Sequence, residues 1–215
     1  LCKYPGLNRF IAGQKIYTHG NDIQFCLTVK KEMTSTSPET VIKVHLAPTD
    51  TAEDVYNKVN KEIEAVKNTP LDSSFDNLAH AFMLIPGLFL KFTVWLLRVL
   101  DYFGLLPKFL LELSPFHGSV FFTSMGSLGI PPIYHHLYDF GNLPLFGSFG
   151  CKRRALEVLE DGTVVQRKYL DFKFSMDERI VDGFYYAAFF KHFKRILYRP
   201  EQLDNPPETV QQDID

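Results

Sequence analysis

Patterns of apolar and polar residues divide most of the chain into strands and helices. Residues 23–30 are rich in strand-forming side chains, and 40–46 and 168–174 alternate polar and apolar positions, as strands with one buried face do. After Gly183 the apolar positions recur every three or four residues, which predicts an amphipathic helix over 184–198. The pattern therefore predicts a domain in which strands and helices are mixed.

Turn signals and capping residues place further elements. Residues 10–18 are expected to form a short hairpin, and Asp161-Gly162 forms the expected tip of a second hairpin over 155–165. Thr51 opens a capping-box sequence, Thr-Ala-Glu-Asp, and apolar residues follow it at helical spacing, so a helix is predicted to begin there. Further strands are expected over 119–123 and 143–150.

An apolar segment over 78–113 interrupts this regular alternation of elements. Pro86-Gly87 and Gly104 divide it into two or three short helices, and every window of about 20 residues contains a charge or a helix breaker, so we do not expect a membrane span. Three interpretations stay open. The helices could pack against the sheet or a neighbouring subunit, form a wall for a long acyl chain, or rest on a membrane surface.

Composition excludes some classes of protein. The 215 residues are enough for one domain, and 23 basic against 25 acidic residues give a net charge of −2, without the basic surface of a nucleic-acid-binding protein. Three cysteines lack paired or metal-ligand spacing, which predicts buried free thiols in a reducing, cytoplasmic compartment and no metal site. Residues 200–215 are polar and acidic, so a disordered tail is expected there.

Charged residues gather between the strand at 168–174 and the final helix. They are Asp177, Glu178, Arg179 and Asp182, and Gly183 follows them as a residue that permits close approach of the backbone. The stretch resembles the H-x-x-x-D-G motif of the CoA-dependent acyltransferase superfamily, which includes chloramphenicol acetyltransferases and the acyltransferase core of 2-oxo acid dehydrogenase complexes. Asp182-Gly183 matches the motif and Arg179 stands in its usual place, whereas Glu178 replaces the general-base histidine.

A second stretch is similar to the same family. Thr123-Ser-Met-Gly126 and Gly129-Ile130 follow its pattern at the end of a strand. The resemblance implies that the Thr123 hydroxyl donates a hydrogen bond to the oxyanion of a tetrahedral intermediate. The alternative is a strand-end threonine that caps a glycine turn.

The resemblance leaves the identity of the base open. Glu178 can accept a proton, and His135 and His136, in the loop that follows the Thr123 strand, could replace the missing family histidine. The family also implies that Asp182 is chiefly structural and pairs with an arginine, here Arg179. The catalytic candidates are therefore Glu178, Thr123 and Asp182, with His135 or His136 as alternative bases and with Arg179 and Gly183 as structural residues. A salt-bridged turn without a catalytic role is the competing interpretation of the charged junction.

Fold, function and partners follow from this resemblance as expectations. It implies an α+β, chloramphenicol acetyltransferase-like two-layer sandwich over 1–199, N-terminally incomplete, with 78–113 as an insertion. The expected activity is transfer of an acyl group from coenzyme A, a substrate rather than a cofactor, to an unknown acceptor in a homotrimer, without a metal. The alternative is an inactive member of the fold that binds acyl ligands or serves assembly. Peripheral contact of 78–113 with a membrane or lipid stays open.

Overall fold

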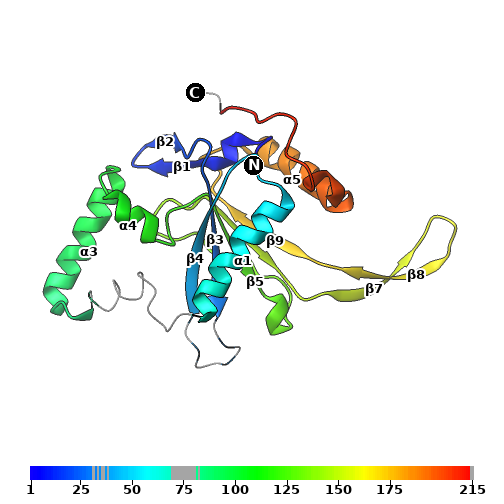
Figure 1. Ribbon diagram of the computed structural model, residues 1–215, viewed down its shortest axis with the longest axis horizontal. Coiled ribbons are helices and arrows are strands. Elements are labelled where there is room, and N and C mark those ends of the chain that lie inside the picture. Colours follow the sequence, from blue (N-terminus) through cyan, green and yellow to red (C-terminus); the bar gives the residue numbers. More distant parts are fainter. Residues whose placement is uncertain are drawn as a thin grey trace.

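A five-stranded mixed sheet forms the centre of the protein (Figure 1). The computed structural model describes residues 1–30, 32, 34, 37, 39–68, 81 and 83–213. The strand order is β4-β3-β5-β6-β9. The bounds of these strands are Ile23–Lys30 for β3, Glu39–Leu46 for β4, Val120–Ser124 for β5, Leu145–Phe149 for β6 and Phe172–Met176 for β9.

The direction of each strand decides which residues meet at each edge of the sheet. β3, β5 and β6 run parallel to one another, whereas β4 and β9 run antiparallel to their neighbours. In this register Thr123 lies beside Ser148, and Ser148 lies beside Lys173. The α+β fold with a mixed sheet, predicted from the sequence, is confirmed.

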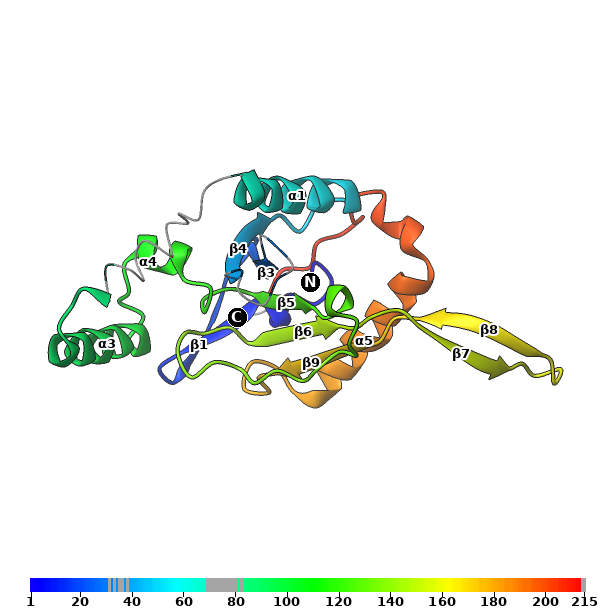
Figure 2. The same cartoon turned by 90° about the horizontal axis from the view of Figure 1, so that it is seen from below.

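Two helices cover one face of the sheet, α1 (Ala52–Asn68) and α5 (Gly183–Tyr198) (Figure 2). Val59, Ile63 and Val66 of α1 pack against β3 and β4, as their helical spacing predicts. Aromatic rings of α5 pack against β9, where Phe193 contacts Phe174 edge to face at 5.9 Å. The two helices and the sheet form the two layers.

Gly147 allows the aromatic rings on this helix-covered face to close over the sheet. A Cβ atom at Gly147 would lie 2.6 Å from the ring of Phe122 and 2.9 Å from that of Phe174. These two rings meet edge to face at 5.7 Å between centroids. The core of β5, β6 and β9 thus requires a residue without a side chain at this position.

The opposite face of the sheet is covered by the loop over 131–140. Ser148 of β6 is buried and fixes the loop, because its hydroxyl donates to the Ile133 carbonyl at 2.6 Å and accepts from the Ile133 amide at 3.1 Å. Phe121 and Phe146 stack at 4.8 Å beneath the loop. The loop is therefore held on the sheet at a defined place.

Two hairpins extend from the central sheet, β1 (Arg9–Ala12) with β2 (Lys15–Thr18), and β7 (Arg153–Val158) with β8 (Val164–Tyr169). Both hairpins were predicted from turn signals. The single strand predicted over 168–174 is wrong, because β8 ends at Tyr169 and β9 begins at Phe172. The chain bends between them at Asp171, whose carbonyl accepts from Gly150 and whose carboxylate pairs with Arg153 at 2.6 Å.

The apolar segment supplies α3 (Gly87–Tyr102) and α4 (Lys108–Leu113), and neither of these fully described helices contains a buried residue. α3 lies at one end of the long axis of the molecule, and the β7–β8 hairpin lies at the other (Figure 1). Asp101 joins the C-terminal end of α3 to the core, since its carboxylate contacts His117 Nε2 at 2.8 Å and accepts from Gly141 at 3.2 Å. None of the helices in the described part of the chain has the length and hydropathy needed to cross a bilayer.

The C-terminal segment differs from the disordered tail expected after residue 199. Pro200–Leu203 forms a 3-10 turn, and the described residues continue to Asp213. Asp213 accepts two hydrogen bonds from Arg9, at 2.6 and 2.8 Å, and the Gln211 amide donates to the Cys2 carbonyl at 3.0 Å. Composition predicted disorder because the segment is poor in apolar residues, but polar contacts with the N-terminal residues hold it in place.

Candidate functional site

A cavity of about 320 Å³ opens where β5 ends. Thr123 lies at this end of the strand, and the 3-10 turn Gly126–Leu128 follows it. The turn ends at Gly129, whose φ of +71° lies in the left-handed region that favours glycine. The cavity is lined by Thr28, Lys30, Glu39, Phe121, Thr123, Ser124, Met125, Ser127, Leu128, Ile133, His135, Tyr138 and Phe146.

His135 lies in the wall of the same cavity as Thr123. Its imidazole stacks on Phe146 at 4.1 Å between centroids and 8° between planes, so the ring is fixed against the sheet. Nδ1 lies 2.7 Å from the carbonyl of His136 and must donate to it, because a carbonyl oxygen only accepts. In the neutral ring this leaves Nε2 with a free lone pair, which is the form that a general base needs.

His136 lies outside the lining of this cavity and is exposed to solvent. Its ring stacks on that of His135 at 4.5 Å. Of the two alternative bases predicted from the sequence, His135 is thus the one that shares a cavity with Thr123.

Glu178 lies near the other end of the sheet. Across the sheet, Thr123 of β5 pairs with Ser148 of β6, and Ser148 pairs with Lys173 of β9. β9 runs antiparallel to β6, so Met176 lies about 10 Å beyond Lys173, toward the opposite end of the sheet from Thr123. Glu178 follows Met176 and is exposed. The lining of the Thr123 cavity in the described chain does not include Glu178, so one copy of the chain does not bring these two candidates together.

The charged junction has a different pairing from the one predicted. Arg179 binds Asp177, with Nη2 and Oδ2 2.6 Å apart and Nε and Oδ1 2.8 Å apart, rather than Asp182. Burial acts to raise the pKa of Asp177, but the hydrogen bonds from Arg179 outweigh it and lower that pKa below its ordinary value. Asp182 instead caps α5, accepting from the Tyr185 amide at 2.9 Å.

Two further residues of the junction differ from what the sequence indicated. Apart from its chain neighbours and the backbone of α5, no heavy atom of the described residues would lie within 4 Å of a Cβ atom at Gly183, so these residues do not make the close approach expected there. Tyr186, which sequence reasoning assigned only to the helix pattern, is 3% exposed and donates to the Asp177 carbonyl at 2.9 Å. Burial raises the pKa of this phenol, which stays a donor. Tyr186 therefore fixes the turn to α5.

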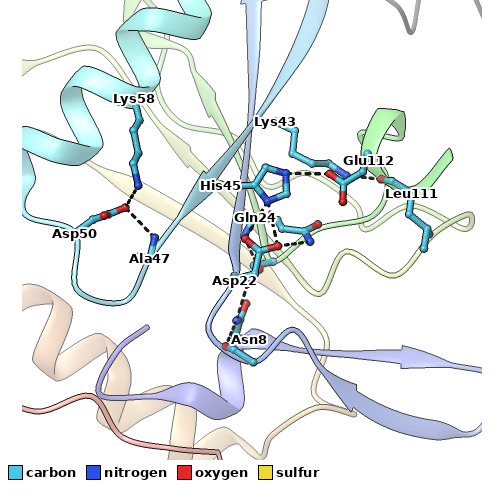
Figure 3. A network of polar contacts seen from close by, with 12 residues as sticks. Asn8, Asp22, Gln24, Lys43, His45, Ala47, Asp50, Lys58, Leu111 and Glu112 are labelled. Carbon is cyan, nitrogen blue, oxygen red and sulfur yellow. Dashed lines mark hydrogen bonds and ion pairs between the residues drawn. The ribbon is translucent and has the colours of Figure 1, made fainter. Parts of the chain in front are cut away.

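A second polar cluster, not anticipated from the sequence, joins α4 to the sheet (Figure 3). The imidazole of His45 lies between two carboxylates, with Nδ1 2.9 Å from Asp22 and Nε2 3.0 Å from Glu112. Lys43 donates to the Leu111 carbonyl at 2.6 Å, and burial lowers its pKa. Side chains alternate between the two faces of a strand, so Lys43 and His45, two residues apart in β4, lie on the same face. This spacing is the signal in the sequence that could have indicated the cluster.

A larger cavity of about 410 Å³ lies between the β1–β2 hairpin and α3–α4. His19 lines it, and burial lowers the pKa of this histidine to about 4, so its ring is neutral at pH 7. Among the described residues, no group of three or more His, Cys, Asp and Glu side chains is placed to hold a metal ion.

Comparisons with known proteins bear on both the sequence and the fold. Residues 148–204 match the profile of the family described as 2-oxoacid dehydrogenases acyltransferase (catalytic domain). The chain resembles this catalytic domain. The acyltransferase match includes the junction at Asp182-Gly183 and α5, so the resemblance predicted from the sequence is confirmed. None of the curated proteins matches the chain.

One solved structure supports the fold predicted from the sequence. A probable dihydrolipoamide acetyltransferase from Listeria monocytogenes superposes with a TM-score of 0.59 at 15% identity, over 92% of this chain and 64% of that one. This chain therefore spans less than two thirds of that structure. A dihydrolipoamide acetyltransferase from Azotobacter vinelandii gives a TM-score of 0.47 at 14% identity, over 92% and 63% of the two chains.

Proposed function

We propose that this protein is an acyltransferase that moves an acyl group from a coenzyme A thioester to a thiol, hydroxyl or amine. The observation that carries the proposal is the cavity at the end of β5, which is lined by both Thr123 and His135. The acyltransferase fold and the family match over 148–204 support the reaction class. Coenzyme A, as the acyl carrier, is part of the proposal.

Each residue has a defined part in this reaction. His135 Nε2 accepts the proton of the acceptor group as that group attacks the thioester carbonyl. The carbonyl oxygen becomes an oxyanion, and the Thr123 hydroxyl donates a hydrogen bond to it. When the intermediate collapses, the carbon–sulfur bond breaks and the departing thiolate takes the proton from the imidazolium of His135. Phe146 and the His136 carbonyl keep the ring in the orientation that this cycle needs.

Glu178 is not assigned as the base in this reaction. It could reach a Thr123 cavity only from a second copy of the chain, because the two residues lie toward opposite ends of one sheet. A homotrimer, which the family resemblance implies, would supply such a copy. We therefore propose His135 as the base and treat a Glu178 from a neighbouring copy as the competing assignment.

Release of free coenzyme A from a panel of acyl-CoA donors tests the proposal. Thr123→Val removes the hydroxyl and is expected to lower kcat about 10²- to 10³-fold, as removal of an oxyanion donor does. His135→Gln is expected to lower kcat about 10²- to 10⁴-fold. His136→Gln is the matched control, because it keeps the backbone carbonyl that orients His135 and changes only a side chain outside the cavity lining, so it should keep most of its turnover.

Glu178 provides the decisive comparison. Glu178→Gln should keep its activity if His135 is the base. If instead Glu178→Gln is inactive and His135→Gln is active, the assignment to His135 is wrong. In that case Glu178→Gln and Thr123→Val can be mixed, so that an intact Thr123 from one variant meets an intact Glu178 from the other. Recovery of activity in the mixture would place the site between two copies. Binding of acyl-CoA without turnover by the unaltered chain would contradict the acyltransferase proposal itself.

A further inference from the structure

α3 exposes large apolar side chains to solvent over much of its circumference. The helix extends from one end of the molecule, on the side opposite the β7–β8 hairpin (Figure 1). Its most exposed apolar residues are Leu88 at 80%, Phe89 at 66%, Phe92 at 59% and Trp95 at 57%. An exposed apolar surface of this kind on one helix marks an interaction site.

The exposed residues form a continuous stripe. Leu88, Phe92 and Trp95 follow one another at spacings of four and three residues, which places them on one side of the helix. The rings of Phe92 and Trp95 lie 5.7 Å apart. Phe89 and Leu96, also exposed, lie beside this line.

The charges of α3 show what kind of surface fits the stripe. Lys91 and Arg98 are exposed and seven residues apart, so they lie along one edge of the stripe. The one acidic residue of α3, Asp101, is turned to the protein and binds His117 and the Gly141 amide. The charge that α3 presents to solvent is therefore entirely positive.

We propose that α3 binds the surface of membranes rich in anionic phospholipids. In this arrangement Leu88, Phe92 and Trp95 enter the boundary between headgroups and acyl chains, and the long side chains of Lys91 and Arg98 reach the phosphates. The 16 residues of α3 span about 24 Å. That length suits a helix that lies along the membrane surface. In this orientation Lys91 and Arg98, along one edge of the apolar stripe, lie at the level of the lipid headgroups.

The chain contains a direct reporter for this proposal. Trp95 is its only tryptophan, so the tryptophan emission of the whole protein reports on α3 alone. Titration with phosphatidylcholine vesicles that contain phosphatidylglycerol should shift this emission to shorter wavelength, and the protein should float with the vesicles in a density gradient. Vesicles of phosphatidylcholine alone should bind the protein more weakly, and added salt should reduce binding to the anionic vesicles.

Two variants separate the apolar and electrostatic contributions. Replacing Lys91 and Arg98 together by Gln should lower the partition coefficient for anionic vesicles about 30-fold, because each basic residue contributes about fivefold. Phe92→Glu should abolish flotation. Leu156→Glu, at a side chain 71% exposed on the distant β7–β8 hairpin, is the matched control and should bind as the unaltered chain does. Circular dichroism verifies that each variant is folded.

Several results would overturn the proposal. The unaltered protein could fail to float with anionic vesicles, or it could bind neutral and anionic vesicles equally. An emission shift that follows protein concentration without lipid, with no further change on adding vesicles, would show that a second copy of the chain covers the stripe. Each of these results is independent of acyl transfer, so it leaves the proposed enzyme activity to its own test.

Discussion

His19 is a residue whose burial makes the stability of the fold depend on pH. Its folded-state pKa of about 4 lies below its ordinary value of 6.5, so the unfolded chain binds more protons between these values. The contribution of the neutral His19 to the free energy of unfolding is fully present above pH 6.5 and is lost as the pH falls toward 4. Over that range the free energy of unfolding should decrease by about 3 kcal/mol on account of His19.

Urea unfolding at pH 7 and pH 4 measures this effect of His19. His19→Gln should show a smaller loss of stability between the two pH values than the unaltered chain does. His136→Gln, which changes an exposed histidine, should show the same loss as the unaltered chain. Equal pH dependence in all three proteins would contradict the assignment.

Asp182 offers a second prediction at the residue scale. As an N-cap, its carboxylate accepts from the Tyr185 amide, and Asp182→Ala should lower the free energy of unfolding by about 1 kcal/mol. Asp182→Asn should retain most of the stability, because asparagine caps a helix about as well. Thermal or urea unfolding of both variants checks this. A loss as large in Asp182→Asn as in Asp182→Ala would show that the residue acts through its charge.

At the scale of elements, the packing of rings over β6 gives a matched pair of glycine variants. Gly147→Ala forces a methyl group against Phe122 and Phe174 and should cost about 1–3 kcal/mol of stability. Gly183→Ala, at the start of α5, meets no described residue outside its own helix and should be neutral or stabilise by about 0.5 kcal/mol. Urea midpoints of the two variants compare them directly. Similar effects would contradict the packing described for β6.

The strands and helices could be predicted where local pattern decides them. β3 occupies the residues expected for it, 23–30, because its side chains favour an extended chain throughout. The strand expected over 168–174 failed at Asp171, because the bend there depends on Arg153 and Gly150 in another part of the chain. Contacts of this kind leave no periodic signal in the sequence.

For the molecule as a whole, the sequence identified the chemical groups of the candidate site but not their arrangement. Thr123 could be placed at a strand end from its motif, and His135 could be placed only in the loop that follows. The stacking of His135 on Phe146 depends on how that loop folds back over the sheet. The separation of Glu178 from Thr123 depends on the antiparallel direction of β9, which no local pattern determines.

Because of that separation, the two ends of the sheet differ: Thr123 lies at one end and the carboxylate of Glu178 lies near the other. If the threonine end of one copy contacts the carboxylate end of the next, each contact is heterologous, because it joins two different patches. Such head-to-tail contacts close into a ring when the rotation between copies divides a full circle, and otherwise continue as a fibre. In a closed ring every chain would lend a carboxylate to one neighbour and a threonine to the other, so the number of composite sites would equal the number of chains.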